Sequence, residues 1–427
     1  MLKGLSKEEK SWIWFDWANQ SYVMIVMTTI MSLHFLHAAS VSGVEREVAS
    51  AYWGIGNSIA TFTAGILAPV IGTLSGYQGI KKKLFNFFNF MSIAATVALA
   101  FVPVTYWWIL LIIFVISSIG FACGGKIYDA FLVDVAPEEN MHRVSTLGFA
   151  LGYIGGAIAF ILAIVLVVLS EFNVVAFDVA TAYRLSFVIA AVWWIIFYIP
   201  MLKNVKQTYG RAPESGFIKK SFLDVWQTLK EVLGHKKIAL FLVAFFLYSD
   251  GVGSIIRMAT AYGDTIGIGA MTLLMVLLVT QFVAFPFAII YGKMAIKYGA
   301  KRTIYFGIFT YILVCAIALF MHPDRDIQTL TIMFWSLAML VGTAQGGIQA
   351  LSRSYFSKII PKEKSNEFFG IYNIFGRFAS IIGTTLFGIV ALITGQPHYG
   401  IAIIAVLFII AAVIFKFVPD DRNFHVD

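Results

Sequence analysis

Asp250 is the most informative ionisable residue in this chain, because it lies inside a long apolar run that opens at Ile238. A charge at the centre of a membrane helix costs about 2.5–3.5 kcal/mol, so it is retained where it meets a partner, a cavity or a ligand. Gly251 and Gly253 weaken the helix at this point, and interrupted helices mark binding sites in transporters. The pattern predicts a substrate-binding role for Asp250, with a buried helix-packing site as the alternative.

Arg257 follows Asp250 by seven residues, on the same helix face and about 10 Å further along the axis. That separation excludes a direct ion pair within the helix, so each side chain needs a partner elsewhere. We therefore treat Arg257 as a candidate gating residue. The alternative is that it extends to the membrane interface.

Two further arginines in apolar surroundings are candidates for anion recognition. Arg377 lies about ten residues into its helix from Glu367, near mid-depth, and Arg353 lies in the preceding apolar run. A guanidinium binds a carboxylate through two parallel hydrogen bonds and stays charged. A zwitterionic solute would offer its carboxylate to an arginine and its ammonium to Asp250 or Asp16. The alternative is that helix carbonyls or an acidic neighbour satisfy each arginine.

Uncharged polar side chains complete the predicted substrate-binding set. Asn373 lies one helical turn before Arg377 on the same face. The alternative for each of these residues, which its type favours, is a hydrogen-bonding contact between helices. The full set is Arg377, Asn373, Asp250, Arg353, Gln349 and Asn19, and Gln345 is a further member of the uncharged group.

Three residues of the first half are candidates for coupling or gating. Asp16 lies about 9 Å into the first helix from Lys10, where it either carries a coupling proton or pairs near the surface. Lys126 and Asp129 are three residues apart on one helix face and can pair directly. Alternatively, Asp129 reaches Arg353 in the other half and forms a latch that opens and closes during transport.

Composition places the chain among polytopic membrane proteins, since 59% of its residues are hydrophobic and 13% are charged. Apolar runs of about 20 residues predict membrane helices. We expect twelve, near 12–37, 50–75, 84–102, 106–134, 144–169, 183–202, 238–259, 268–293, 302–321, 328–356, 367–394 and 398–418. The first run is expected to stay as a helix rather than be cleaved, because it is too long and carries Asp16 and Asn19.

Lys and Arg concentrate in alternate connections, which predicts that both termini face the cytoplasm. This distribution explains the net charge of +8 without a nucleic-acid partner. The longest connection predicts the domain organisation: a six-helix bundle over 1–202, a linker over 203–237 and a second bundle over 238–427. Apolar residues at helical spacing predict an amphipathic helix within the linker.

The two halves repeat each other in the same direction. Gly72, Gly79 and Lys81 match Gly292, Gly299 and Lys301 in spacing, and both sets follow the second helix of their half. The stretch 125–137 also parallels 349–361, which aligns Asp129 with Arg353. A same-direction duplication gives two bundles related by an axis along the membrane normal, with the substrate path between them.

These loops resemble the loop motif of the major facilitator superfamily. Longer stretches resemble one branch of it, the vacuole effluxer (autophagy-related amino-acid effluxer) family and its bacterial relatives. They are scattered over nearly the whole chain: 14–22, 128–137, 147–156, 246–259, 281–286, 345–354 and 368–377. The resemblance implies twelve helices, alternating access and, from the yeast members, amino-acid efflux.

The chain also departs from the superfamily pattern. The loop motif usually has an acid where Gly76 and Ile296 stand. That acid normally pairs with a basic residue at the cytoplasmic gate, so this contact is expected to be weakened in both halves. At position 129 the family often has Asn where this chain has Asp. These differences put the usual gating network in doubt.

We therefore predict an all-α membrane protein of the major facilitator fold that carries a small polar solute, with proton coupling left open. The alternative is a non-transporting receptor or scaffold on the same fold. No nucleotide-binding loop or intramembrane protease motif is present in the sequence, so no enzyme activity is expected. We expect no cofactor or metal, a monomer in contact with lipid, and a location in a bacterial cytoplasmic membrane.

Overall fold

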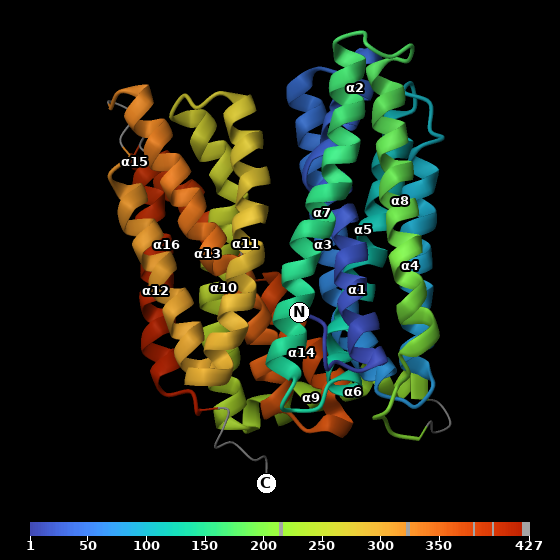
Figure 1. The fold of residues 1–427 in the computed structure, drawn as a ribbon, viewed down its shortest axis with the longest axis vertical. Coiled ribbons are helices and arrows are strands. Elements are labelled where there is room, and N and C mark those ends of the chain that lie inside the picture. The colour runs from blue at the N-terminus through green and yellow to red at the C-terminus, as the bar shows by residue number, and fades with distance from the viewer. Residues whose placement is uncertain (213–216, 322–324, 379–380, 395–396, 421–427) are drawn as a thin grey trace. The chain divides into compact units, whose positions relative to one another are not determined.

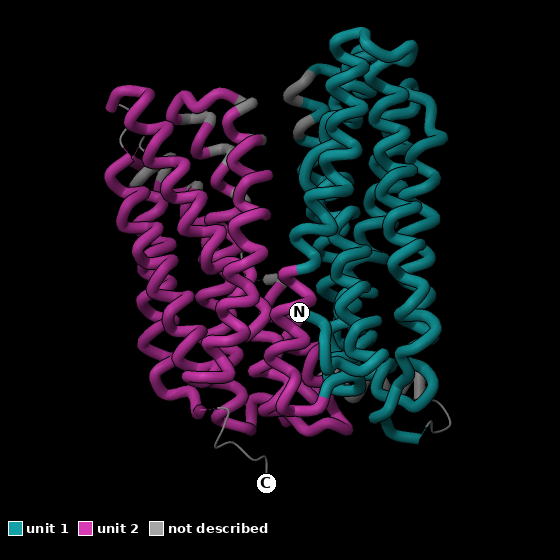
Figure 2. Tube along the Cα trace, in the orientation of Figure 1, with its two compact units in different colours: residues 1–136, 151–222 teal, residues 137–150, 223–427 magenta. Residues whose placement is uncertain are grey.

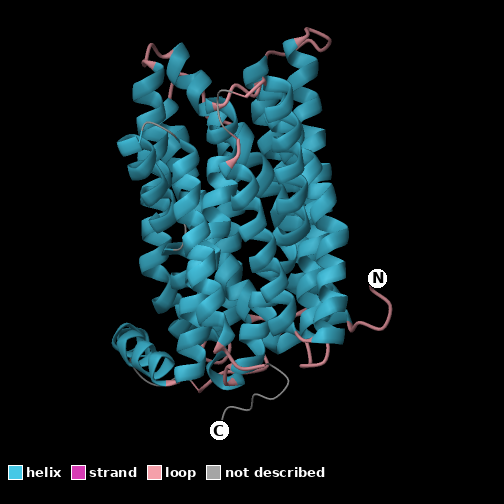
Figure 3. Cartoon of the chain, turned by 90° about the vertical axis from the view of Figure 1, so that its left-hand side faces the viewer, coloured by secondary structure: helices cyan, strands magenta, loops and turns pink. Residues whose placement is uncertain are grey.

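The computed structural model describes residues 1–212, 217–321, 325–378, 381–394 and 397–420. Within these ranges, the side chains of some helical residues, Arg257 and Arg377 among them, are not described. Helices make up most of the described chain, and no strand occurs in it (Figure 3). The prediction of an all-α protein is confirmed.

Packing divides the chain into two compact units (Figure 2). Unit 1 comprises residues 1–136 and 151–222, and unit 2 comprises residues 137–150 and 223–427. The domain boundaries drawn from the sequence stay a prediction. The packing differs from them in grouping residues 137–150, the start of one helix, with the second half of the chain.

The first half of the chain, coloured blue to green in Figure 1, is helical at the six positions predicted for it. The first of these consists of three segments, α1, η1 and α2. The elements are α1 (Lys7–Tyr22), η1 (Val23–Thr29), α2 (Ile30–Val41), α3 (Arg46–Ser75), α4 (Ile80–Leu99), α5 (Trp107–Ala130), α6 (Leu132–Val135), α7 (Met141–Glu171) and α8 (Val179–Asn204).

The second half begins with the predicted linker helix and continues with six membrane helix positions. The elements are α9 (Phe217–Gly234), α10 (Lys236–Thr265), α11 (Ala270–Tyr298), α12 (Ala300–Leu319), α13 (Ile327–Ile359), η2 (Lys362–Lys364), α14 (Ser365–Phe378), α15 (Ile381–Thr394) and α16 (Pro397–Lys416). In the described part of the chain, ten helices are long and apolar enough to cross a membrane. The remaining two predicted spans coincide with α4 and with α14 and α15.

The sequence repeat corresponds to a shared backbone feature. Gly79 precedes α4 with φ of +74°, and Gly299 precedes α12 with φ of +94°. A side chain disfavours positive φ, so glycine at these two matched positions permits the tight turn between the second and third helices of each half.

The expected interruption at Asp250 is wrong, because α10 is helical throughout Lys236–Thr265. Gly251 serves close packing instead, since a Cβ there would lie 2.5 Å from the Phe408 ring of α16. The irregular helix is the first one, where Val23–Thr29 form a π-helix that the sequence analysis did not predict. Such segments occur frequently at functional sites.

Candidate functional site

A buried ion pair in unit 1 joins the start of α4 to the short helix α6. The Lys81 Nζ donates to Asp134 Oδ2, and both side chains are fully buried. Lys81 also donates to the Ala130 carbonyl at the end of α5 (2.9 Å) and lies 4.5 Å from the centre of the Phe131 ring. The ammonium therefore meets a carboxylate, a helix C-terminal carbonyl and an aromatic face, each of which favours a cation.

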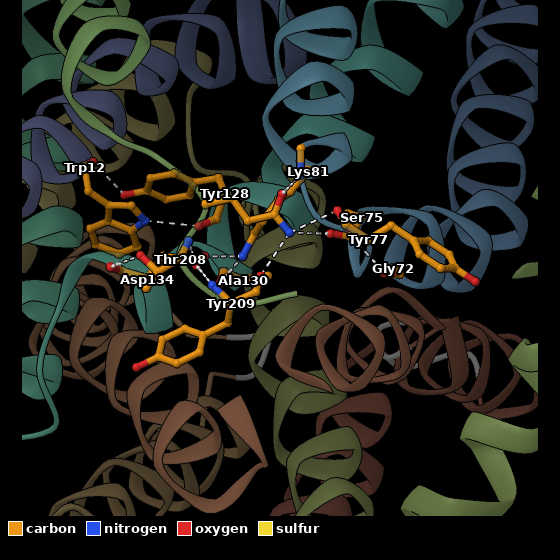
Figure 4. Close-up of polar contacts among 12 residues, drawn as sticks. Trp12, Gly72, Ser75, Tyr77, Lys81, Tyr128, Ala130, Asp134, Thr208 and Tyr209 are labelled. Carbon is orange, nitrogen blue, oxygen red and sulfur yellow. Dashed lines mark hydrogen bonds and ion pairs between the residues drawn. The ribbon is translucent and has the colours of Figure 1, made fainter. Parts of the chain in front are cut away.

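The chain that follows α8 binds to this same carboxylate. The main-chain N–H groups of Thr208 and Tyr209 donate to Asp134 Oδ1 at 2.7 and 3.0 Å, as Figure 4 shows. The two carboxylate oxygens of Asp134 thus have different hydrogen-bond partners. One pairs with Lys81, and the other fixes the chain that leaves α8.

Gln207 attaches this chain to the turn between α3 and α4. Its amide nitrogen donates to the carbonyls of Ser75 (3.4 Å), Tyr77 (3.1 Å) and Tyr209 (2.9 Å), and its oxygen accepts the Gly79 N–H (3.0 Å). A single side chain therefore satisfies main-chain groups on both segments. We call residues 205–211 the linker strap.

Arg211 completes the attachment through its main chain. Its N–H donates to the Gly76 carbonyl (3.0 Å), and its carbonyl accepts the Gln78 N–H (2.9 Å). Its guanidinium lies 4.5 Å from the centre of the Tyr77 ring. The linker strap thus binds at the turn where the usual loop-motif acid is replaced by Gly76.

A reciprocal contact joins α1 to α5 in the same region. The Trp12 indole N–H donates to the Tyr128 carbonyl, and the Tyr128 hydroxyl donates to the Trp12 carbonyl, both at 3.0 Å (Figure 4). Their rings stack with centroids 4.4 Å apart. Both side chains are buried, so the contact satisfies their polar groups without water.

The predicted gating residues of unit 1 lie on α1 and α5. Asp16 and Asn19 are both buried, each 6% exposed. Lys126 is buried and donates to the Ala64 carbonyl of α3 at 3.0 Å, while Asp129 is half-buried. The pairing of Asp129, with Lys126 or with Arg353 of the other unit, stays a prediction.

Asp250 lies fully buried in unit 2 on α10. Its Oδ2 accepts the Gly383 N–H of α15 at 2.8 Å. A Cβ at Gly383 would lie 2.4 Å from Ser254 Oγ and 3.2 Å from Asp250 Oδ1. Glycine at this position therefore permits the close approach of α15 to the carboxylate.

Arg353 of α13 contacts the segment 137–150 within unit 2. Its Nε donates to Ser145 Oγ (3.0 Å), a terminal nitrogen donates to the Ser145 carbonyl (3.2 Å), and the guanidinium lies 4.6 Å from the Phe149 ring centre. Next to it, His142 Nδ1 and Ser354 Oγ are 2.8 Å apart. Arg353 is 4% exposed and binds a helix start in this structure.

The other predicted residues of unit 2 are distributed along α10, α13 and α14. Asn373 is half-buried and donates to the Phe369 carbonyl of its own helix at 2.8 Å. Gln349 is half-buried, and Gln345 is buried against a cavity. The side chains of Arg257 and Arg377 lie outside the described residues, so their predicted roles stay predictions.

The cluster around Lys81 was not predicted from the sequence, although two signals point to it. Lys81 belongs to the repeated glycine–cation loop, and Asp134 lies in the family-like stretch 128–137. Gln207 carried no such signal, because its role depends on how the linker folds back onto the turn.

Comparisons with known proteins agree with this architecture. The model of the family described as vacuole effluxer Atg22 like matches residues 40–425. The uncharacterized MFS-type transporter YxiO of Bacillus subtilis (strain 168) is 46% identical over 423 residues, which cover 99% of this chain and 97% of that protein. Autophagy-related protein 22 of Yarrowia lipolytica (strain CLIB 122 / E 150) is 25% identical over 72% of this chain and 55% of its own length.

Solved structures show the same fold. The proton:xylose symporter XylE bound to 6-bromo-6-deoxy-D-glucose has a TM-score of 0.73 at 12% identity, covering 97% of this chain and 96% of that one. FucP in the outward conformation has a TM-score of 0.72 at 13% identity, covering 97% and 98%. The predicted fold class is confirmed, and the chain belongs to the Atg22-like vacuole effluxer family of major facilitator superfamily transporters.

Proposed function

We propose that this protein is a secondary transporter that moves a small polar solute by alternating access, with amino acids as the solute class. The family and fold support transport of a small solute. The observation that supports a polar solute is the complete burial of Asp250. The chain retains this carboxylate at a large desolvation cost. Asp16 on α1 is also buried.

The amino-acid class comes from the resemblance to the autophagy-related amino-acid effluxers, and the buried groups offer the contacts that it requires. A zwitterion needs a cation for its carboxylate and an acid for its ammonium. Arg377, with Asn373 one turn away, is the proposed carboxylate-binding group, and Asp250 is the proposed ammonium-binding group. Gln349 and Asn19 supply further uncharged contacts.

Arg353 has a different role in this proposal. Because it contacts Ser145 and Phe149 in the structure, we propose that it acts in gating, where Asp129 is its partner in one state of the cycle. Lys126 and Arg257 stay in the coupling and gating set. Asp16 and Asp250 are the proposed proton carriers.

We further propose that the linker strap lies on the cytoplasmic side of a bacterial membrane, with both termini on the same side. The alternation of Lys and Arg between connections supports this orientation. Labelling of single cysteines placed at Thr208 and at Val174 with a membrane-impermeant reagent in intact cells tests it. Labelling at position 174 alone is expected, and labelling at position 208 alone would reverse the orientation.

Counterflow is the experiment that tests the function. Purified protein is reconstituted into liposomes loaded with mixed amino acids, and uptake of a labelled pool is measured. Uptake above protein-free liposomes is expected. Correctly folded protein without uptake would exclude the amino-acid class, and binding without uptake would favour a receptor on a transporter fold.

Arg377→Lys tests the carboxylate-binding role. Lysine keeps the charge and loses the planar pair of donors, so at least a tenfold weaker apparent affinity is expected with folding intact. The matched control is Arg325→Lys, which changes the same residue type in a loop between α12 and α13. Unchanged affinity in Arg377→Lys would exclude this role.

A further inference from the structure

Unit 2 contains a partly open cavity of about 130 Å³. Side chains from α10, α11, α12, α13, α15 and α16 line it, so it lies inside this bundle. Asp250 and Arg353 are not among its lining residues. The cavity is therefore distinct from the polar contacts described above.

The described lining side chains are mostly aliphatic or aromatic, and none of them is charged. Most of the polar groups among them are satisfied within the protein. The Tyr262 hydroxyl donates to the Met321 carbonyl (2.8 Å), and the Thr280 hydroxyl donates to the Val276 carbonyl (2.7 Å). An ionised ligand group would find no described partner here, and its desolvation would oppose binding.

Gln345 differs from these groups. It is 6% exposed on α13 and lines the cavity, and its side-chain amide makes no hydrogen bond to the described residues. The amide thus offers a donor and an acceptor to a molecule inside the cavity.

The size of the cavity limits what it can hold. An apolar protein cavity of about 150 Å³ binds benzene. We propose that this cavity binds a small uncharged molecule, the size of one aromatic ring, whose single hydrogen-bonding group contacts the Gln345 amide. The inference does not depend on the transported solute, because the site needs no translocation to be occupied.

Ligand-observed fluorine NMR on the detergent-solubilised protein tests the proposal, with protein-free micelles as the reference. The probes are 4-fluorophenol, fluorobenzene and 4-fluorobenzoate. We expect 4-fluorophenol to bind about five- to tenfold more tightly than fluorobenzene, because one hydrogen bond contributes about 1 kcal/mol. We expect 4-fluorobenzoate to bind far more weakly than either probe.

Three substitutions test whether the probes bind inside this cavity. Gln345→Leu is expected to equalise the affinities for 4-fluorophenol and fluorobenzene, and Ala338→Phe is expected to abolish binding of both by filling the space. Ile332→Phe is the matched control, since Ile332 lies on the same helix with 60% exposure and does not line the cavity. It should leave both affinities unchanged.

Three results would overturn the inference. They are an unchanged preference for 4-fluorophenol in Gln345→Leu, wild-type binding in folded Ala338→Phe, and binding of 4-fluorobenzoate as tight as that of 4-fluorophenol. Should Ala338→Phe fail to fold, the comparison between Gln345→Leu and wild type decides the question by itself. Counterflow of amino acids is a separate measurement, so its failure leaves this inference intact.

Discussion

Lys81 and Asp134 form a fully buried ion pair in unit 1 that the matched positions of the repeat cannot form. In the register of the sequence repeat, Lys81 corresponds to Lys301 and Asp134 corresponds to Lys358. Two lysines repel each other, and Lys301 instead donates to the Lys416 carbonyl at 2.9 Å. The duplicated halves have therefore diverged at this point, and only the first half attaches the linker strap through a carboxylate.

Breaking the Lys81–Asp134 pair should destabilise the protein strongly. Lys81→Met leaves a buried carboxylate without its cation, and we expect a loss of about 3–5 kcal/mol in the free energy of unfolding. Lys81→Met combined with Asp134→Asn should recover part of that loss, because asparagine is uncharged and still accepts N–H donors. Equilibrium unfolding in detergent measures both values.

The control for this pair is Lys364→Met. The Lys364 Nζ lies 2.6 Å from Glu231 Oε1, and the two side chains are 45% and 31% exposed, respectively. An exposed pair contributes about 0–1 kcal/mol, so little change is expected. Equal losses in Lys81→Met and Lys364→Met would contradict the importance of burial at Lys81.

Gln207→Leu should release the linker strap. The substitution removes the four hydrogen bonds of the Gln207 amide, each with a net contribution of about 0.5–1.5 kcal/mol. We expect at least tenfold faster amide exchange in residues 205–211, measured by hydrogen–deuterium exchange mass spectrometry. Thr208→Ala is the control, since its hydroxyl makes a single contact of 3.4 Å with the Asp134 carbonyl. Protection that persists in Gln207→Leu would show that Asp134 holds the strap without Gln207.

Arg353 and Ser145 should be energetically coupled. We expect Arg353→Lys to cost about 1.5–3 kcal/mol in unfolding free energy, because lysine cannot present the planar donors that reach the Ser145 hydroxyl and carbonyl. A double-mutant cycle with Ser145→Ala should give a coupling energy above about 1 kcal/mol. The same cycle with Ser336→Ala, an exposed serine of α13, should be additive. Additivity in both cycles would mean that Arg353 has its main partner elsewhere.

Gly383→Ala should disturb the contact between α10 and α15. Its Cβ would lie 2.4 Å from Ser254 Oγ, so we expect a loss of about 1–3 kcal/mol in unfolding free energy. Ser254→Ala removes that oxygen and should restore part of the loss in the double variant. Gly125→Ala is the control, because a Cβ there meets no heavy atom within 4 Å. A neutral Gly383→Ala would show that α15 has room to move.

Asp250→Asn should separate proton coupling from folding. The asparagine oxygen still accepts the Gly383 N–H, so the fold should be kept, while the proposed proton-carrying group is lost. We expect pH-driven uptake in liposomes to disappear and exchange to persist with a weaker apparent affinity, because asparagine lacks the charge proposed to contact the ammonium. The control is Asp178→Asn, which keeps a good helix cap for α8 at the exposed Thr181 N–H. Intact pH-driven uptake in Asp250→Asn would exclude Asp250 as the carrier.

The sequence by itself determined the membrane class, the positions of the predicted helices and the duplication. These features follow from apolar runs and glycine spacing, which are local properties of the chain. Gly79 and Gly299 illustrate this, since their matched spacing corresponds to matched positive φ values. The buried acids of α1 and α10 were also visible, because a charged residue in an apolar run is conspicuous without any knowledge of its neighbours.

Only the tertiary structure decided which groups meet. Asp134 and Gln207 are 73 residues apart in the chain, and their common role at the turn before α4 depends on the path of the linker after α8. The π-helix at 23–29 and the unbroken α10 were likewise decided by packing, since Gly251 accommodates the Phe408 ring rather than weakening its helix. Apolar periodicity records which segments cross the membrane, but hydrogen-bond partners on different helices are fixed by three-dimensional contacts that leave no periodic pattern in the sequence.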